Sequence, residues 1–243
     1  MNFHLLASGS KGNAFVLEKD GSMILIDCGT TKKYLIESLT ALNLNPEMFD
    51  SVLITHNHSD HVRQINMFKN HPNIYTPEPL AVSHKLAVPY EPFKVNQFVI
   101  LPLPTSHDAD TSLGYVIQDG EHKLVYMTDT GYVKTSHLEF MRDADYIILE
   151  SNHDPDLLMK TSRPYFVKQR SLSDTGHLSN DSAGEVLSQI VTSRTKEIIL
   201  AHLSEEGNRE DLAIHTVSKY LNGYQGLLKV GRQREIVSSG EIK

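Results

Sequence analysis

Residues 55–61 read Thr55-His56-Asn57-His58-Ser59-Asp60-His61 and follow directly on the apolar, strand-like run Val52-Leu53-Ile54. Histidines two positions apart in an extended segment point to the same side, so His56 and His58 can hold one metal ion. Asp60 and His61, on the turn beyond, can then reach a second ion. A polar loop in which histidines happen to cluster is the alternative, but packing gives no reason for such a run of solvated ligands. The stretch therefore predicts a two-metal hydrolase.

The overall composition indicates one ordinary folded domain. The 243 residues are 40% hydrophobic and 22% charged, and no repeat or linker-like segment divides them, so we expect a single domain over residues 1–243. No run approaches the roughly 20 apolar residues of a membrane span, and the first residues lack the basic start and apolar core of a signal peptide. A cytoplasmic protein with no membrane partner is the expectation.

Charge and cysteine content exclude several kinds of site. Cys28 is the only cysteine, which rules out an internal disulfide and a thiolate-rich zinc site, and its expected role is to fill space in the core. The formal net charge of −7 argues against a broad nucleic-acid-binding surface, because such surfaces need clustered lysine and arginine. Two divalent ions would nevertheless add about four positive charges at the one place where an anion would react.

The order of the expected strands and helices indicates two sheets packed face to face and covered by helices. Three apolar runs, Phe3 to Ala7, Ala14 to Glu18 and Met23 to Asp27, are separated by hairpin-type turns, and a helix capped by Thr30 or Thr31 follows. Residues 71–95 contain five prolines and are expected to form an irregular surface loop. Further strands are expected near 97–103, 112–118, 122–128, 145–150 and 196–201, and helices near 62–70, 181–193 and 208–221.

Three of the later strands end at a residue that can bind metal. His107 follows the apolar run 101–104 and Thr105-Ser106, Asp129 follows 124–128, and His202 follows 198–201. A site assembled from the ends of several strands is a common way for a rigid scaffold to present ligands to a cleft. Either histidine alone would more often be an ordinary residue at the edge of the core. Together with the run at 56–61 they indicate one shared metal site.

At these positions the chain resembles the metallo-β-lactamase-fold superfamily, with Asp27, His56-x-His58-x-Asp60-His61, His107, Asp129 and His202 in the expected order. The resemblance spans nearly the whole sequence and implies an α/β fold of the α+β type, an αββα sandwich of two mixed sheets flanked by helices. It implies one metal ion on His56, His58 and His107, a second on Asp60, His61 and His202, and Asp129 as the bridge. Asp27 and Glu150 would orient ligands without touching a metal, although a carboxylate such as Asp27 is by itself an ordinary strand-end residue.

Shorter segments resemble one branch of this superfamily, the YycJ/WalJ-type exonucleases; these segments are 6–13, 149–154, 176–180 and 200–204. The resemblance implies a metal-dependent phosphodiesterase or nuclease that acts on DNA or a short oligonucleotide, with Asp60 and Asp129 in the catalytic centre. Ribonuclease Z has a similar Gly-His-Ser turn whose histidine assists cleavage, so His177 is a candidate acid; a structural loop histidine is the alternative.

The same metal core would also serve a small-molecule hydrolase acting on a cyclic phosphodiester, a lactone or a thioester, because loops set the substrate. A non-catalytic, metal-stabilised binding module is a third interpretation, which an incomplete ligand set would have favoured. Mixed imidazole and carboxylate ligands suit Zn²⁺ or Mn²⁺, and also Fe²⁺. We therefore expect two divalent metal ions, with DNA or alternatively a small phosphodiester as the partner.

Positive charge near the expected site comes from Arg163, Lys168 and Arg170, which precede His177. Lys168 and Arg170 are candidates for holding a substrate phosphate, although a charge cluster is usually a solvated face. Ser8 and Ser10 are further candidates, because the glycines of their turn allow close backbone approach to an anion; a tight hairpin is the alternative.

Overall fold

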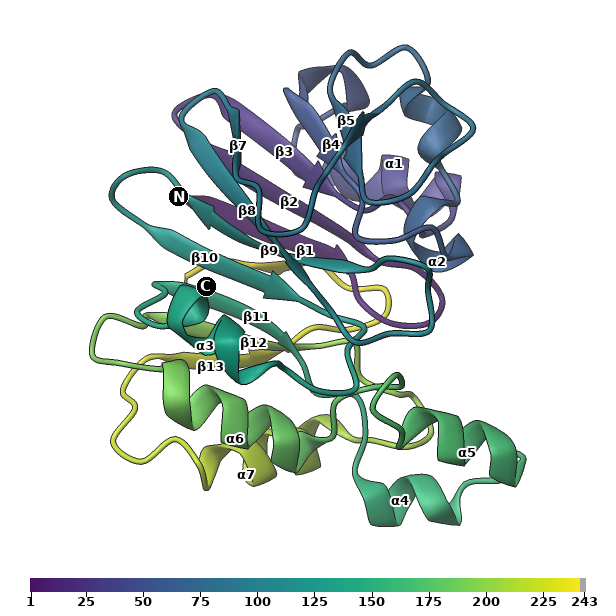
Figure 1. Cartoon of the computed structure of the whole chain (residues 1–243), viewed down its shortest axis with the longest axis vertical. Helices are drawn as coiled ribbons and strands as arrows, with labels where there is room; N and C mark the ends of the chain where they lie inside the picture. Colours follow the sequence, from purple (N-terminus) through teal and green to yellow (C-terminus); the bar gives the residue numbers. More distant parts are fainter. Residues whose placement is uncertain (241–243) are drawn as a thin grey trace.

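A computed structural model describes residues 1–240 of the chain, as two seven-stranded sheets with helices outside them (Figure 1). The first sheet has three antiparallel pairings, between β14, β1, β2 and β3, followed by three parallel pairings out to β6. In strand order its members are β14 (Val237–Ser238), β1 (Asn2–Ala7), β2 (Ala14–Lys19), β3 (Ser22–Ile26), β4 (Ser51–Leu53), β5 (Ile74–Thr76) and β6 (Lys85–Leu86).

The second sheet has the same mixed pattern, with three parallel pairings from β13 to β10 and three antiparallel pairings from β10 to β7. In strand order its members are β13 (Leu227–Val230), β12 (Glu197–Ala201), β11 (Tyr146–Glu150), β10 (Lys123–Met127), β9 (Leu113–Gln118), β8 (Phe98–Pro104) and β7 (Phe93–Val95). The strands expected in this part of the sequence are thereby confirmed, as are the two N-terminal hairpins.

The main core lies between the two sheets, and the alternation of side chains along the strands explains it. On β11, Ile148 joins the core between the sheets, whereas Ile147 and Leu149 pack under the outer helices. On β12, Ile199 and Ala201 face the other sheet in the same way. Because successive strand residues point to opposite faces, strands that are buried on both faces are apolar throughout, which is why these runs are continuous rather than alternating.

Helices cover the outer face of each sheet (Figure 1). On the first sheet, α1 (Lys32–Ala41) is capped by Thr31, whose hydroxyl accepts from the Tyr34 amide at 3.3 Å, and it buries Leu35 and Leu39. On the second sheet lie α3 (Thr135–Met141), α6 (Asn180–Ile190) and α7 (Glu210–Ser218), with their apolar residues in one cluster with β10, β11 and β12. The αββα sandwich is therefore confirmed. No helix within residues 1–240 is long and apolar enough to cross a membrane.

Two short helices, α4 (Pro155–Lys160) and α5 (Tyr165–Ser171), lie beside the sandwich rather than over a sheet (Figure 1). Asp154 caps α4 by accepting from the Leu157 amide at 2.8 Å. The Lys168 ammonium of α5 donates to the carbonyls of Met159 and Thr161 at 2.9 and 2.7 Å. This lysine therefore fastens α5 to the end of α4. We call residues 155–172 the helical projection.

The helix expected near 62–70 is wrong in its bounds. The structure has α2 (Ser59–Val62) and a separate 3-10 turn, η2 (Ile65–Phe68), so Asp60 and His61 lie on a helical turn rather than on a loop before one. The physical reason is a pair of backbone hydrogen bonds across the fold: the Cys28 amide donates to the His61 carbonyl at 2.8 Å, and the Gln64 amide donates to the Cys28 carbonyl at 3.0 Å. These bonds interrupt the helix.

The irregular loop expected over 71–95 is also wrong, because this segment contains β5, β6 and β7. The first two extend the first sheet, and the third closes the edge of the second. Tyr75 and Phe93 stack with ring centroids 4.2 Å apart. The prolines confine these strands to two or three residues but leave them in the sheets, since strands this short at sheet edges need few amide donors. The structure also contains a 3-10 turn, η1 (Pro46–Met48).

Candidate metal centre

The expected ligands meet at one edge of the sandwich, because the strands before them end there. In the first sheet β3 and β4 are parallel; in the second, β8 and β10 are both antiparallel to β9, and β10, β11 and β12 are parallel. The carboxyl ends of the strands in each set therefore share an edge. Glu150 is the last residue of β11, and the residues that follow the other strand ends are Asp27, His56, His107, Asp129 and His202.

The structure brings the expected ligands into two groups of three. His56, His58 and His107 have ligand atoms within 4.8 Å of one another, and so do Asp60, His61 and His202. His56, His61 and His202 are buried, with at most 3% of each exposed. These are the same two sets that the sequence resemblance implied. Both groups combine imidazole nitrogens from the 56–61 run with a histidine from the opposite sheet, so the site joins the two halves of the sandwich.

Asp129 lies between the two groups. Its Oδ2 is 3.2 Å from His61 Nε2, and its Oδ1 is 3.5 Å from His202 Nε2 and 3.8 Å from His107 Nε2. Burial raises the pKa of this carboxyl, but His202 and His61 outweigh that effect and hold it well below its ordinary value. Asp129 is therefore an ionised carboxylate that can reach cations on either side.

The imidazoles are oriented through their Nδ1 atoms. His61 Nδ1 donates to Asp27 Oδ2 at 2.8 Å, His202 Nδ1 donates to Glu150 Oε1 at 2.9 Å, and His107 Nδ1 donates to the Gly176 carbonyl at 3.3 Å. Because Nδ1 is engaged in each ring, the lone pair of the neutral imidazole is on Nε2, the nitrogen that faces Asp129. Asp27 and Glu150 therefore lie beside the candidate ligands His61 and His202.

Thr55 completes the support of the first sheet's ligands. Its amide and hydroxyl both donate to the Asp27 carboxylate at 2.9 Å, and His56 Nδ1 lies 3.1 Å from the same hydroxyl oxygen. Burial lowers the pKa of His61, yet the carboxylates of Asp27 and Asp129 raise it well above its ordinary value. The surrounding carboxylates therefore favour a positive charge at this position, which a bound cation would also supply.

Glu150 connects the metal-ligand cluster to His177. Its Oε1 accepts from His177 Nδ1 at 2.8 Å as well as from His202, while its Oε2 accepts from the Thr130 amide at 2.8 Å. Burial raises the pKa of Glu150, but His177 and His202 outweigh it and lower that pKa below the ordinary value. A single ionised carboxylate thus fixes His177 and His202 relative to each other. His177 Nε2 is left as the nitrogen that can exchange a proton with a substrate.

Three residues at this edge have backbone conformations that residues other than glycine rarely adopt. Asp27, Asp129 and His202 have φ values of 59°, 55° and 56°, in the left-handed region. Such conformations outside glycine cost free energy and persist where surrounding contacts enforce them, often at functional sites. Gly29 shows how tightly the loops meet, because an added Cβ there would lie 1.6 Å from the Asp60 carbonyl oxygen. The strand-end turns are therefore held in one arrangement.

The residues present fit divalent cations. Among the described residues, His56 Nε2, His202 Nε2 and Asp129 Oδ2 are buried without a hydrogen-bond partner, and Asp129 Oδ2 lies 3.2 Å from His61 Nε2. A buried polar atom without a partner is costly, and three of them directed into one cluster indicate that a ligand completes the site. Imidazoles and carboxylates are the donor set of zinc and manganese sites.

The basic candidates differ in their positions. Arg170 has 62% of its side chain exposed, and its Nη2 lies 2.5 Å from Asp108 Oδ2, while Asp108 Oδ1 lies 3.3 Å from His107 Nε2. The structure therefore brings Arg170 to the edge of the cluster. It does not bring Lys168 there, because that ammonium is bound to two carbonyls within the helical projection. Arg163 pairs with Glu206 at 3.2 Å on the surface.

The two serine candidates also differ. Ser8 is buried, and its hydroxyl oxygen accepts from the His202 amide at 2.7 Å, so it supports a ligand instead of facing solvent. Ser10 is exposed at the tip of the turn.

Sequence reasoning assigned no role to two asparagines that the structure places at the site. Asn13 Nδ2 lies 2.9 Å from His61 Nε2, and Asn152 Nδ2 donates to the His202 carbonyl at 2.7 Å. Both asparagines occur in the short segments that carried the resemblance, 6–13 and 149–154, which was the available signal. Asp108, next to His107, was likewise not identified, and nothing but its position beside a ligand pointed to it.

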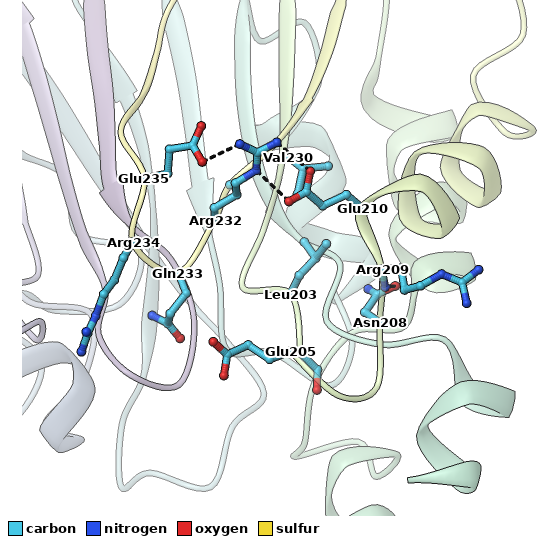
Figure 2. Close-up of a pocket in the computed structure, with 12 residues that line it drawn as sticks. Leu203, Glu205, Asn208, Arg209, Glu210, Val230, Arg232, Gln233, Arg234 and Glu235 are labelled. Carbon is cyan, nitrogen blue, oxygen red and sulfur yellow. Dashed lines mark hydrogen bonds and ion pairs between the residues drawn. The ribbon is translucent and has the colours of Figure 1, made fainter.

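A pocket of about 400 Å³ lies beyond His202, between the loop that follows β12 and the segment after β13. Figure 2 shows Arg232 between Glu210 and Glu235 in this pocket; its contacts to Glu210 are 2.7 and 2.9 Å, and that to Glu235 is 2.5 Å. Three arginines and three glutamates line the pocket, and none of the candidate metal ligands does. Its charge is balanced, so it is a poor site for a phosphate backbone.

Comparison with known proteins gives a consistent result. Residues 22–203 match the family described as the β-lactamase superfamily domain. The chain is 34% identical over 235 residues to exodeoxyribonuclease WalJ of Streptococcus pneumoniae, covering 90% of this chain and 87% of that protein. It is 32% identical over 235 residues to exodeoxyribonuclease YycJ of Bacillus anthracis, covering 91% and 89%. Among solved structures, the metallo-β-lactamase-fold protein YhfI of Bacillus subtilis matches with a TM-score of 0.70 and 20% identity, covering 97% of this chain and 98% of that one.

Proposed function

The chain belongs to the β-lactamase superfamily, and from this premise we propose that it is an exodeoxyribonuclease that binds two divalent metal ions. The fold and the ligand cluster make it a metal-dependent hydrolase of phosphodiester bonds. One observation carries the finer proposal: two groups of three ligands lie on either side of Asp129, and Glu150 joins one of them to His177. DNA as the substrate is supported by the similarity to the two exodeoxyribonucleases.

In this proposal His56, His58 and His107 would hold one cation, Asp60, His61 and His202 would hold the other, and Asp129 would serve both. When bound, two such cations lower the pKa of water and neutralise negative charge on phosphoryl oxygens. The chain's own contribution is rigid placement. Asp27 and Glu150 fix the imidazole rings, and the left-handed turns at the strand ends keep the ligands from rearranging.

His177 is the proposed general acid. Cleavage of a phosphodiester leaves a negative charge on the departing sugar oxygen, which a nearby proton donor neutralises. Glu150 accepts the Nδ1 hydrogen of His177, so the proton that His177 gives to the leaving oxygen comes from Nε2. The same hydrogen bond fixes the orientation of the His177 ring. His177 is about one fifth exposed, which allows a substrate to reach it.

The test is a panel of substrates with metal-loaded protein and with chelator-treated protein. The panel comprises DNA labelled at defined 5′ and 3′ ends, bis-p-nitrophenyl phosphate, a lactone and a thioester. The proposal expects stepwise release of nucleotides from a DNA end that stops when metal is removed. Faster turnover of the lactone or the thioester than of any phosphodiester would contradict it and favour the small-molecule hydrolase.

A further inference from the structure

Two aromatic side chains are exposed at the start of α5. Phe166 is 72% exposed and Tyr165 is 63% exposed, and within residues 1–240 no other large hydrophobic side chain is as exposed as either. Figure 1 shows α5 with α4 beside the sandwich, away from the helices that cover the sheets. Large apolar side chains gathered at a protruding surface commonly mark a binding site.

The helical projection is basic in composition, and three of its four cations have partners: Arg170 lies 2.5 Å from Asp108, Arg163 lies 3.2 Å from Glu206, and Lys168 donates to two carbonyls. The helical projection contains four basic residues, Lys160, Arg163, Lys168 and Arg170, and one acidic residue, Asp156, in a chain of net charge −7. Aromatic rings among basic side chains are the combination that binds single-stranded nucleic acid, with bases on the rings and phosphates on the cations.

The projection is also continuous with the candidate metal centre. Phe166 and Arg170 are four residues apart on α5, which makes their side chains neighbours on one helix face, roughly 5–6 Å apart at Cβ. Arg170 pairs with Asp108 at 2.5 Å, and Asp108 lies 3.3 Å from His107 Nε2. At the same C-terminal end of α5, the His177 amide donates to the Ser171 carbonyl at 3.0 Å. The helix that carries Phe166 is therefore fixed to both a candidate ligand and the candidate acid.

We propose that Phe166, with Tyr165 beside it, is a stacking platform for unpaired bases at a single-stranded DNA end, and that Arg170 contacts the phosphate next to them. This inference rests on the proposed function, since it states that the DNA end bound beside the metal centre is single-stranded. The strand must be unpaired because the faces of bases within a duplex are covered by their neighbours. A surface ring reaches such a face only where the stack ends.

A protein partner would be the other occupant of an exposed aromatic surface. The excess of basic residues on the projection and the connection through Arg170 and Asp108 to His107 favour DNA, because a phosphate can replace the Asp108 carboxylate as the partner of Arg170, four residues from Phe166. The pocket in Figure 2, on the side beyond His202, is lined by equal numbers of arginines and glutamates and is therefore a poorer binding site for a DNA strand.

Binding of DNA to the full-length chain in the presence of chelator tests the platform without cleavage. The probes are a labelled 12-nucleotide thymidine oligomer, an abasic oligomer of the same length and a blunt duplex, measured by fluorescence anisotropy. Wild type is expected to bind the thymidine oligomer most tightly. Phe166→Ala should weaken that binding at least about fivefold and leave the abasic oligomer unchanged, since a stacked base contributes about 1–3 kcal/mol.

Three variants make the result specific. Phe166→Trp should retain binding, and Phe166→Leu should lose it, because leucine keeps an apolar contact but has no π-face. Phe140→Ala removes another exposed phenylalanine, 41% exposed on α3, and should change nothing. Equal binding by wild type and Phe166→Ala, or full binding by Phe166→Leu, would overturn the platform.

Kinetics of metal-loaded protein separate this inference from the proposed function. With Phe166→Ala the KM for single-stranded DNA should rise while turnover of bis-p-nitrophenyl phosphate stays at the wild-type value. If wild type hydrolyses neither substrate, the proposed function fails. If wild type cleaves DNA and the variant cleaves it with the same KM, only the platform fails.

Discussion

The candidate metal centre and the helical projection lie next to each other but are built in opposite ways. At the centre four of the seven candidate ligands are buried (His56, His61, Asp129 and His202), each oriented imidazole has a hydrogen-bond partner on Nδ1, and the backbone is held in left-handed turns. On the projection the aromatic rings are exposed, and Lys168 is the side chain that ties its two helices together. In the proposed function the strand ends position the reacting groups, and the projection selects the substrate.

These separate roles predict that changes at the centre abolish hydrolysis of every substrate, while changes on the projection affect polymeric DNA alone. Rigid strand ends favour catalysis, because small displacements of the reacting groups lower the reaction rate strongly. The exposed side chains of the projection can be substituted without disturbing the sandwich.

The largest effect is expected from removing a ligand. Asp129→Ala, His58→Ala and Asp60→Ala should each lower hydrolysis of both DNA and a chromogenic diester on the order of 10⁴-fold or more, because the cations lose a ligand. His58 and Asp60 are partly exposed, so their variants should keep the circular dichroism spectrum of wild type. Glu121→Ala is the control, since Glu121 belongs to a separate surface group with Asp119 and His122. Activity within a few fold of wild type for Asp60→Ala would show that the chemistry lies elsewhere.

The next effect concerns the proposed acid. His177→Ala should reduce turnover by roughly 10²- to 10⁴-fold without changing the metal content, because the loss of a general acid leaves the ligands in place. Elemental analysis beside steady-state kinetics measures the two quantities. His215→Ala, at an exposed histidine on α7, should be without effect. Full activity of His177→Ala on every phosphodiester would leave His177 as a structural loop histidine.

A smaller effect is expected from the carboxylate that orients His61. Asp27→Ala removes the acceptor of three hydrogen bonds and should weaken metal binding about 10- to 100-fold, the usual cost of losing such a partner. Competition with a chromogenic chelator measures this affinity. Since the metal can be restored by mass action, activity should recover at high metal concentration. A variant that remains inactive in saturating metal would show that Asp27 has another role.

The smallest effect distinguishes two basic residues of the projection. Arg170→Ala should weaken DNA binding and reduce the salt dependence of the binding constant by about one unit of slope, since one phosphate contact is lost. Lys168→Ala should leave that slope unchanged, because its ammonium is bound to carbonyls of Met159 and Thr161. Titration of DNA at several salt concentrations measures both. An equal fall in slope for the two variants would contradict the positions described above.

The clustering of the candidate ligands could be predicted from sequence because each of them is next to a strand end or within a seven-residue run. The bounds of α2 could not, because hydrogen bonds from Cys28, far away in sequence, interrupt the helix. The sequence also did not show that Lys168 turns toward α4 while Arg170 reaches the edge of the ligand cluster. Residues two apart on a helix face different directions, and only the packing of α5 on α4 decides which ammonium or guanidinium turns inward. Phe166 gave no sequence signal, since one apolar residue in an amphipathic segment is expected to be buried.

The most direct test of the two-metal nuclease is a titration of chelator-treated protein with Zn²⁺ or Mn²⁺ while DNA hydrolysis and bound metal are followed together. Activity should rise with occupancy and reach its plateau at two ions per chain. Asp129→Ala should not reach that plateau, because Asp129 lies between both groups of ligands. A plateau of activity at one bound ion, or DNA hydrolysis that persists without metal, would contradict the two-metal nuclease.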